Sequence, residues 1–186
     1  TIVSQALCDR ALTAVESTYR SAPGTPADAL VAALSSANGM LFRRNLRADS
    51  AHQAALNLGA ATVVGRSVTV GLLGAIHVCG ALAGRALLVP ADSPWLESTA
   101  AAGELQPPAG RLGTASPRVF AAELATGDVL ALVTANLARS MPMAVSRFRC
   151  WERSIWQATT MPEGRWVSRT ALLVLLTFFR PGLRNE

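Results

Sequence analysis

The sequence predicts an α+β domain in which two helices precede a set of antiparallel strands. Residues 2–20, and the segment that follows Thr25, carry apolar residues at helical spacing. From Gly59 onward, bulky and small residues alternate with the period of two that is typical of strands. The chain has 186 residues, of which 51% are hydrophobic and 16% are charged. That composition can bury a sizeable core, so we expect residues 1–186 to form a single domain.

The two helices have clear boundary signals. The first helix presents Val3, Leu7, Ala11 and Val15 on one face, and it ends where Pro and Gly occur in Ser21–Gly24. Thr25 is a favourable N-cap for the second helix, because Pro26 then takes the first helical position and Asp28 the third. We expect this helix to end near Arg43-Arg44-Asn45, where positive charge suits a helix C-terminus.

The segment from Gly59 to Val89 is predicted to form three antiparallel strands, or four if Gly65-Arg66 is itself a turn. Ala83-Gly84 is interpreted as a hairpin turn, and the return strand is Arg85–Val89. His77 lies on a strand with apolar neighbours, which favours a partly buried sheet residue over a catalytic base.

The later half is expected to contain three more strands and one helix. The stretch Phe120–Leu137 indicates a strand, a tight turn at Thr126-Gly127-Asp128, and a second strand, Val129–Thr134, that is apolar enough to be buried on both faces. Residues 90–117 are loop-like, residues 139–159 are predicted to be helical, and the chain is expected to close with a strand over residues 170–179.

Charge and cysteine content limit the partners and the compartment. The net charge is +5, and the sequence contains arginine but no lysine. This positive charge could favour an acidic partner, RNA or an anionic membrane. The arginines are scattered and are not interleaved with aromatic residues, unlike a nucleic-acid platform. The longest apolar run, residues 171–179, is too short to span a membrane as a helix. Cys8, Cys79 and Cys150 are widely spaced, which favours free thiols in a reducing intracellular compartment, cytoplasmic or organellar.

The stretch from Gly127 to Leu137 resembles the late strand pair of the metal-dependent Ser/Thr protein phosphatases, the PPM or protein phosphatase 2C-like family. That family reads Gly-Asp, an apolar strand, and then Thr-Asp-Gly-Leu. Here Gly127-Asp128, Thr134 and Leu137 match, while Ala135 and Asn136 replace the Asp and the Gly.

Two further segments extend the resemblance. Leu82-Ala83-Gly84-Arg85 stands where the family has Gly-Asp-Ser-Arg, and Ser168-Arg169 stands where it has Asp-Asn before the last strand. The resemblance implies a four-layer α-β-β-α sandwich of two antiparallel sheets flanked by helices. It also implies that the domain is N-terminally incomplete and lacks the family's first strand pair.

The resemblance implies that two Mn²⁺ or Mg²⁺ ions would activate water for phosphoserine or phosphothreonine hydrolysis. Hard cations need carboxylate oxygens, which the side chains of Ala135, Ser168 and Ala83 lack. We therefore expect a pseudophosphatase with no catalytic residue, no metal ligand and no cofactor. A vestigial pocket would be formed by Ala83, Arg85, Ala135, Asn136 and Ser168.

The expected role is a binding or structural subunit with protein partners, without a small-molecule substrate. Trp95 and Trp166 are candidate interface residues, because tryptophan is enriched at binding hot spots. We also expect an open sheet edge that a partner strand could cover. Two alternatives remain open: an active Mn/Mg-dependent phosphatase whose ligands come from outside the motifs above, and an RNA-associated subunit, which a contiguous arginine face would support.

Overall fold

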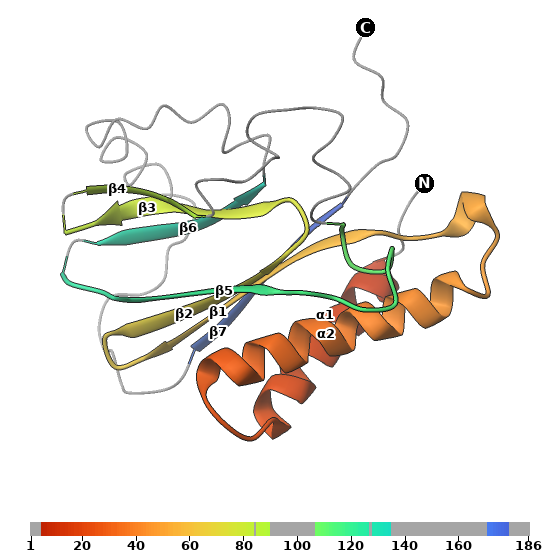
Figure 1. The fold of residues 1–186 in the computed structure, drawn as a ribbon, viewed down its shortest axis with the longest axis horizontal. Coiled ribbons are helices and arrows are strands. Elements are labelled where there is room, and N and C mark those ends of the chain that lie inside the picture. Colours follow the sequence, from red (N-terminus) through yellow and green to blue (C-terminus); the bar gives the residue numbers. More distant parts are fainter. Residues whose placement is uncertain (1–4, 84, 90–106, 127, 135–170, 179–186) are drawn as a thin grey trace, which may run out of the picture.

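In a computed structural model, the structure describes residues 5–83, 85–89, 107–126, 128–134 and 171–178. Two helices open the chain and two antiparallel sheets follow (Figure 1). The elements are α1 (Gln5–Ser21), α2 (Pro26–Asn45), the 3₁₀ turn η1 (Ser50–His52), β1 (Leu56–Val64), β2 (Ser67–Leu73), β3 (Ile76–Leu82), β4 (Arg85–Val89), β5 (Arg118–Glu123), β6 (Val129–Thr134) and β7 (Ala171–Phe178).

The predicted start of the second helix is confirmed. The Thr25 hydroxyl accepts a hydrogen bond from the Asp28 amide at 3.2 Å, and the Asp28 carboxylate accepts one from the Thr25 amide at 3.1 Å. This reciprocal capping box satisfies two of the amides that a helix N-terminus leaves without partners. The hydrogen bonds from Thr25 also lower the pKa of the Asp28 carboxyl group. Pro26 occupies the first turn, as the sequence predicts.

The strands form a four-stranded sheet in the order β5-β2-β1-β7 and a three-stranded sheet in the order β4-β3-β6. Every pairing is antiparallel. Gly65 has φ of +61° in the turn between β1 and β2, so the four-strand interpretation of residues 59–89 is correct. The first strand begins at Leu56, three residues before Gly59. The chain passes from the first sheet to the second near Gly74, whose φ is +87°.

The elements stack in layers, with the helix pair on one face of the four-stranded sheet and the three-stranded sheet on its other face (Figure 1). Side chains of α1, α2 and β1 form the helix-facing core, and side chains of both sheets form the core between the sheets. In β2 the bulky residues Val68, Val70 and Leu72 point into the inter-sheet core. Gly71 lies on the opposite face, against Leu34 and Leu30 of α2. The bulky and small residues of β2 alternate because one face of the strand packs against the other sheet and the opposite face packs closely against α2.

The expectation that residues 120–134 form one strand pair is wrong. β5 pairs with β2 in the four-stranded sheet, whereas β6 pairs with β3 in the three-stranded sheet. The connection between them bridges the two sheets, and the Leu124 amide in it donates to the Arg66 carbonyl at 2.7 Å. Turn chemistry at Asp128 predicts that the chain bends here, but which strand each flank pairs with depends on contacts far away in the sequence.

Two expectations about burial also need correction. Residues 129–132 of β6 are only half-buried, because β6 is an edge strand among the described residues, and Val133 alone of residues 129–133 is buried. His77 was expected to be partly buried and is in fact completely buried, with an exposed fraction of 0%. The last strand is confirmed as β7, while the predicted helix 139–159 and the loop around Trp95 lie outside the described residues.

Candidate functional site

Two predicted pocket positions, Ala83 and Arg85, belong to the turn that joins β3 and β4. Ala83 has φ of +48°, and Leu82 pairs directly with Arg85 across the turn. The Asp128 carboxylate accepts a hydrogen bond from the Ala83 amide at 2.8 Å and another from the Ala125 amide at 2.8 Å. Asp128 therefore ties the β3–β4 turn to the start of β6, which confirms its interpretation as a turn residue. Arg85 is exposed beside this turn.

The other three pocket positions, Ala135, Asn136 and Ser168, lie outside the described residues, as do Trp95 and Trp166. Their described neighbours nevertheless have fixed places in the sheets. Thr134, just before Ala135, pairs with Ile76 at one end of β3, whereas Val129 pairs with Ala81 at the other end, beside Ala83. Five residue steps separate these ends, or roughly 17 Å at the rise of a strand. Ala83 and the end of β6 are therefore not brought together.

The start of β7 also lies away from the end of β6. Ala171, three residues after Ser168, pairs with Val63 near the β1–β2 turn. Thr134 lies at the opposite end of the sandwich, where β2 passes into β3. Among the residues that the structure describes, the strands next to the predicted ligand positions do not converge.

No group of three or more His, Cys, Asp or Glu side chains within the described ranges could hold a metal ion. His77 and Cys79 lie two residues apart on β3, and both are fully buried. Burial raises the pKa of the Cys79 thiol to about 11, so the thiol stays protonated at neutral pH. A protonated thiol is a poor nucleophile, so Cys79 is a core residue.

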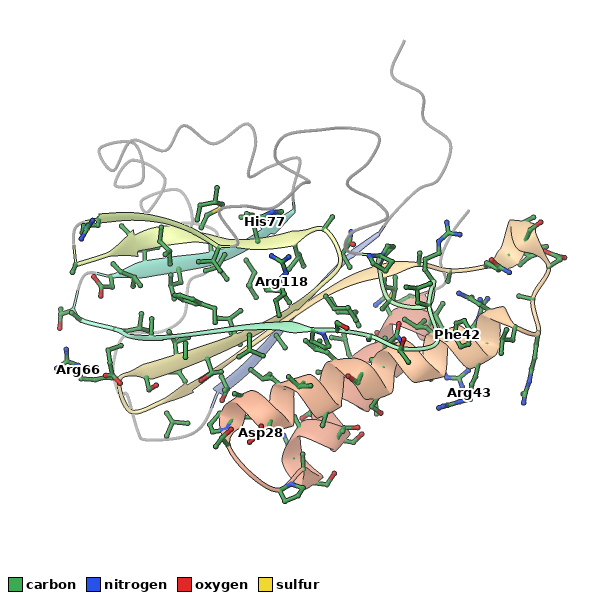
Figure 2. All side chains as sticks on the ribbon, in the orientation of Figure 1. Asp28, Phe42, Arg43, Arg66, His77 and Arg118 are labelled. Carbon is green, nitrogen blue, oxygen red and sulfur yellow. The ribbon has the colours of Figure 1, made fainter. Side chains whose placement is uncertain are left out.

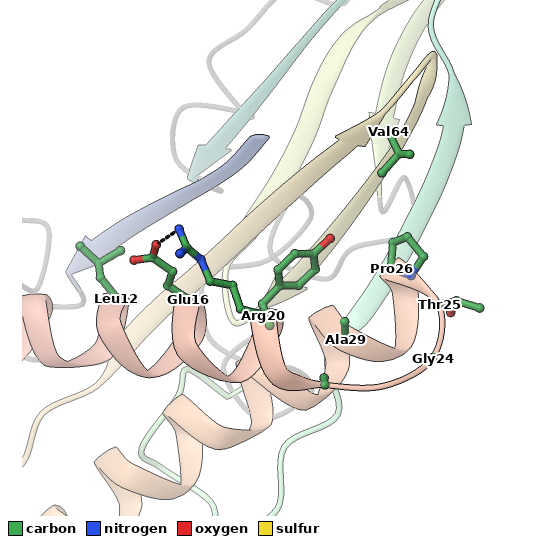
Figure 3. A pocket seen from close by; sticks show the side chains of 10 residues that line it. Leu12, Glu16, Arg20, Gly24, Thr25, Pro26, Ala29 and Val64 are labelled. Carbon is green, nitrogen blue, oxygen red and sulfur yellow. Dashed lines mark ion pairs between the residues drawn. The ribbon is translucent and has the colours of Figure 1, made fainter. Parts of the chain in front are cut away.

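A cavity of about 760 Å³ opens between the two helices and the tip of the β1–β2 hairpin (Figure 3). Its walls include the ion pair between Glu16 and Arg20 at 2.6 Å, the capping residue Thr25 and the exposed Val64. Tyr19, which also lines the cavity, donates a hydrogen bond to the Thr62 hydroxyl at 2.8 Å and joins α1 to β1. Glu16 and Arg20 bond each other, and Tyr19 and Thr25 bond Thr62 and Asp28 outside the lining, so this cavity supplies no convergent set for catalysis.

Two buried asparagines of α2, which we did not single out from the sequence, hold the loop of residues 107–113. The Asn45 side chain donates to the carbonyls of Ala54 and Gly110, at 2.6 and 2.9 Å, and accepts from the Ala54 amide at 2.9 Å. The Asn38 side chain donates to the Leu112 carbonyl at 3.0 Å and accepts from the Gly110 amide at 2.9 Å. A signal was present, because amide side chains seven residues apart share one face of a helix.

A second cavity, of about 510 Å³, lies where this loop meets Leu72, Gly74 and the beginning of β5. Asn38 and the prolines Pro107 and Pro108 contribute to its wall. The Asn38 side-chain amide already forms hydrogen bonds with the loop backbone. We therefore interpret this cavity as a consequence of the way the loop packs against α2.

Comparison with protein-family models, with curated proteins and with solved structures gave no match. Over the described ranges, neither helix has the length and the apolar character required to cross a bilayer.

Proposed function

We propose that this chain is a catalytically inactive relative of the metal-dependent Ser/Thr protein phosphatases and acts as a binding or structural subunit of a protein assembly. The proposal rests mainly on Ala135, which follows β6 at the position where the family has a metal-binding Asp. An apolar strand introduced by Gly127-Asp128 ends in Thr134, and Ala135 follows where the family has a metal-binding Asp. An alanine side chain offers no oxygen to Mn²⁺ or Mg²⁺.

Two features of the described structure support the part of the proposal that no metal centre forms. The acid that the motif retains, Asp128, uses both carboxylate oxygens on backbone amides, which makes it a structural clamp. The described flanks of the other ligand positions, Thr134 and Ala171, lie at opposite ends of the sandwich. A two-metal site needs its carboxylates around ions about 4 Å apart. The finer architecture that we propose is the family's four-layer sandwich, of which α1, α2 and the two sheets would form three layers.

The direct test is calorimetry with Mn²⁺ and Mg²⁺, together with hydrolysis of an aryl phosphate, on the complete chain. An active phosphatase of the family serves as the positive control in the same buffer. We expect no saturable metal binding at micromolar concentrations and no metal-dependent hydrolysis. Micromolar binding accompanied by turnover would contradict the proposal and support the active-phosphatase alternative.

Inactivity alone does not make a protein a subunit, so a second measurement is needed. Tagged chain, expressed in its source cells, should elute from a sizing column well above its monomer mass of 19.5 kDa. Cross-linking would then identify the co-eluting polypeptide. Elution of all the protein as a monomer would contradict the subunit role.

A further inference from the structure

Each sheet has two edge strands among the residues that the structure describes, namely β5 and β7 in the larger sheet and β4 and β6 in the smaller. An edge strand carries a row of backbone N–H and C=O groups with which another strand can pair. Proteins commonly protect such edges with charged side chains, with proline, or by keeping the strand short. These protective features are distributed unevenly over the edges of this protein.

β5 and β4 carry such protection. Arg118 begins β5 and Glu123 ends it, and both side chains are exposed. Directly after β5, the Arg66 side chain donates a hydrogen bond to the Leu124 carbonyl at 3.0 Å (Figure 2). β4 has only 5 residues and begins with the exposed Arg85. Pairing of a further strand with either edge would therefore have to accommodate charge.

β6 carries none of these protective residues. Its sequence, Val-Leu-Ala-Leu-Val-Thr, has no charge and no proline. The side chains of residues 129–132 are half-buried although they are apolar. A strand added beside β6 would bury more of this apolar surface, which is favourable by about 25 cal/mol for each Å² removed from water.

The sequence of β6 is also symmetric. Residues 129–133 read Val-Leu-Ala-Leu-Val in either direction, with Ala131 at the centre. A twofold axis perpendicular to a sheet keeps each side chain on its own face, and opposite residues of an antiparallel pair share a face. Two β6 strands can satisfy both conditions about an axis at Ala131. Ala131 then lies opposite its own copy, Val129 opposite Val133, and Leu130 opposite Leu132.

The smaller sheet leaves space for such a strand. Gly59 of β1 lies against Ile76 of β3 and Leu132 of β6, since a Cβ on this glycine would come within 3.2 and 3.6 Å of them. β1 therefore lies opposite β3 and β6, and β7 is the next strand beyond β1 in its own sheet. Because β6 is the last described strand of the smaller sheet, a strand added to it would extend that sheet over β7.

We infer that β6 is the surface at which a second copy of this chain binds, by antiparallel pairing of the two β6 strands about a twofold axis at Ala131. The two smaller sheets would then form one sheet in the order β4-β3-β6-β6-β3-β4. A twofold dimer uses the same surface on both copies, so the surface must be complementary to itself, as β6 is. The inference rests on the proposed subunit role, for which it names one partner.

Two other pairings fit the observations less well. β7 is the other described edge strand without a charged residue. Two β7 strands would join two four-stranded sheets into one of eight strands, above the common size of about four to six, whereas pairing through β6 gives six. An extended segment of a different protein could also pair with β6, but such a partner would leave the symmetry of its sequence without a purpose.

The first test is sedimentation equilibrium of the purified complete chain in reducing buffer. A pair of short strands is small beside a standard interface of about 1,600 Å². We therefore expect a reversible dimer, of twice the monomer mass of 19.5 kDa, with a Kd on the order of micromolar. A chain that stays monomeric at about 100 µM, where a micromolar dimer would be nearly complete, would overturn the inference.

Charged variants at the axis locate the interface. A131E and A131K each place two like charges roughly 5 Å apart in the dimer, so each variant alone should dimerise at least about tenfold more weakly. A mixture of the two should recover the dimer, because opposite charges then face each other, and recovery excludes a folding defect. A121K, at an exposed alanine in the middle of β5, is the matched control and should dimerise like the parent. Equal weakening by A121K, or no recovery in the mixture, would count against β6.

Disulfide cross-linking tests the register. The background is C8A/C79A/C150A, because Cys79 lies opposite Ala131 within one chain and would compete. A131C should be oxidised to a covalent dimer, since opposite Cα atoms of an antiparallel pair lie about 4.5–5.5 Å apart, within the range of a disulfide. A121C on β5 and V174C on β7 are the controls. Cross-linking through either control in place of A131C would assign the interface to another edge and refute the inference.

Failure of this inference is distinguishable from failure of the proposed function. A monomeric pure chain that co-elutes with a different polypeptide from its source cells would refute the dimer and leave the subunit role intact. Metal-dependent phosphatase activity would refute the proposed inactivity without changing the sedimentation result.

Discussion

Asp128 illustrates how the same residue type can serve chemistry or architecture. One of its carboxylate oxygens accepts a hydrogen bond from the Ala83 amide, and the other accepts one from the Ala125 amide. Asp128 therefore joins its own turn to a turn that lies 45 residues earlier in the sequence. An oxygen that already accepts a charge-assisted hydrogen bond gains less from a cation. The role of this residue is therefore read from its partners, which the sequence motif alone does not reveal.

At the residue scale, two glycine-to-alanine changes should have opposite effects. A Cβ on Gly80 would collide with the carbonyl of Val129 on the paired strand, so G80A should destabilise the fold by roughly 2 kcal/mol or more. Gly39 lies inside α2, where a Cβ would meet only the flexible end of Arg43 at 3.4 Å. G39A should stabilise by about 0.5–1 kcal/mol, because alanine loses less backbone entropy in a helix.

Urea unfolding followed by circular dichroism measures both changes. A G80A protein as stable as the parent would mean that β3 and β6 are not paired in the register described here. A destabilised G39A protein would mean that α2 is packed against something at that position.

At the element scale, α2 has three distinct sides. Leu30, Leu34 and Leu41 are buried towards the sheet, Asn38 and Asn45 hold the loop, and Arg43 is exposed. From the sequence, α2 would be predicted to be an ordinary amphipathic helix, because the spacing of its apolar residues identifies only the side that is buried against the sheet. The side that carries the asparagines matters because buried polar groups stabilise a fold only when they are fully paired.

The asparagine clamp makes a prediction for α2. N45A removes four hydrogen bonds, one of them from Arg44, and leaves the buried amide and carbonyl of Ala54 without their partner. We expect a loss of at least about 3 kcal/mol in the free energy of unfolding. Q53A, an amide-to-alanine change at an exposed position, is the matched control and should remain within about 0.5 kcal/mol of the parent.

Thermal or urea unfolding provides the comparison. If N45A and Q53A were equally stable, the loop of residues 107–113 would not depend on the clamp.

At the scale of the whole molecule, the pairing register separates positions that the family resemblance groups together. The end of β6 and the start of β7 lie at opposite ends of the sandwich, next to Ala135 and Ser168 in sequence. Restoring the carboxylates therefore should not restore a metal centre, since two ions about 4 Å apart require ligands from one place.

A135D/S168D tests this directly, by calorimetry with Mn²⁺ and with each single variant as a control. We expect no micromolar site, and the double variant should bind Mn²⁺ no more tightly than the singles. A site with two Mn²⁺ ions at micromolar affinity would show that the two positions meet, contrary to the strand register.

Local chemistry predicted the individual elements of this protein. Thr25, Pro26 and Asp28 mark the start of α2 because a helix N-terminus must satisfy its free amides nearby. The period of two located β2 and β3, whereas the turn at Gly65, where φ is positive, was only one of two alternatives that the sequence left open. These signals act over a few residues, so one sequence is enough to read them.

The tertiary structure alone decided which strands pair and which residues gather. β5 and β6 are separated by a short turn yet belong to different sheets, because β2 and β3 offer them separate edges. Asn45 meets Gly110 across 65 residues of chain, and this contact holds the loop of residues 107–113 against α2. Propensity and periodicity carry no information about such distant partners, because their positions follow from packing the whole core at once.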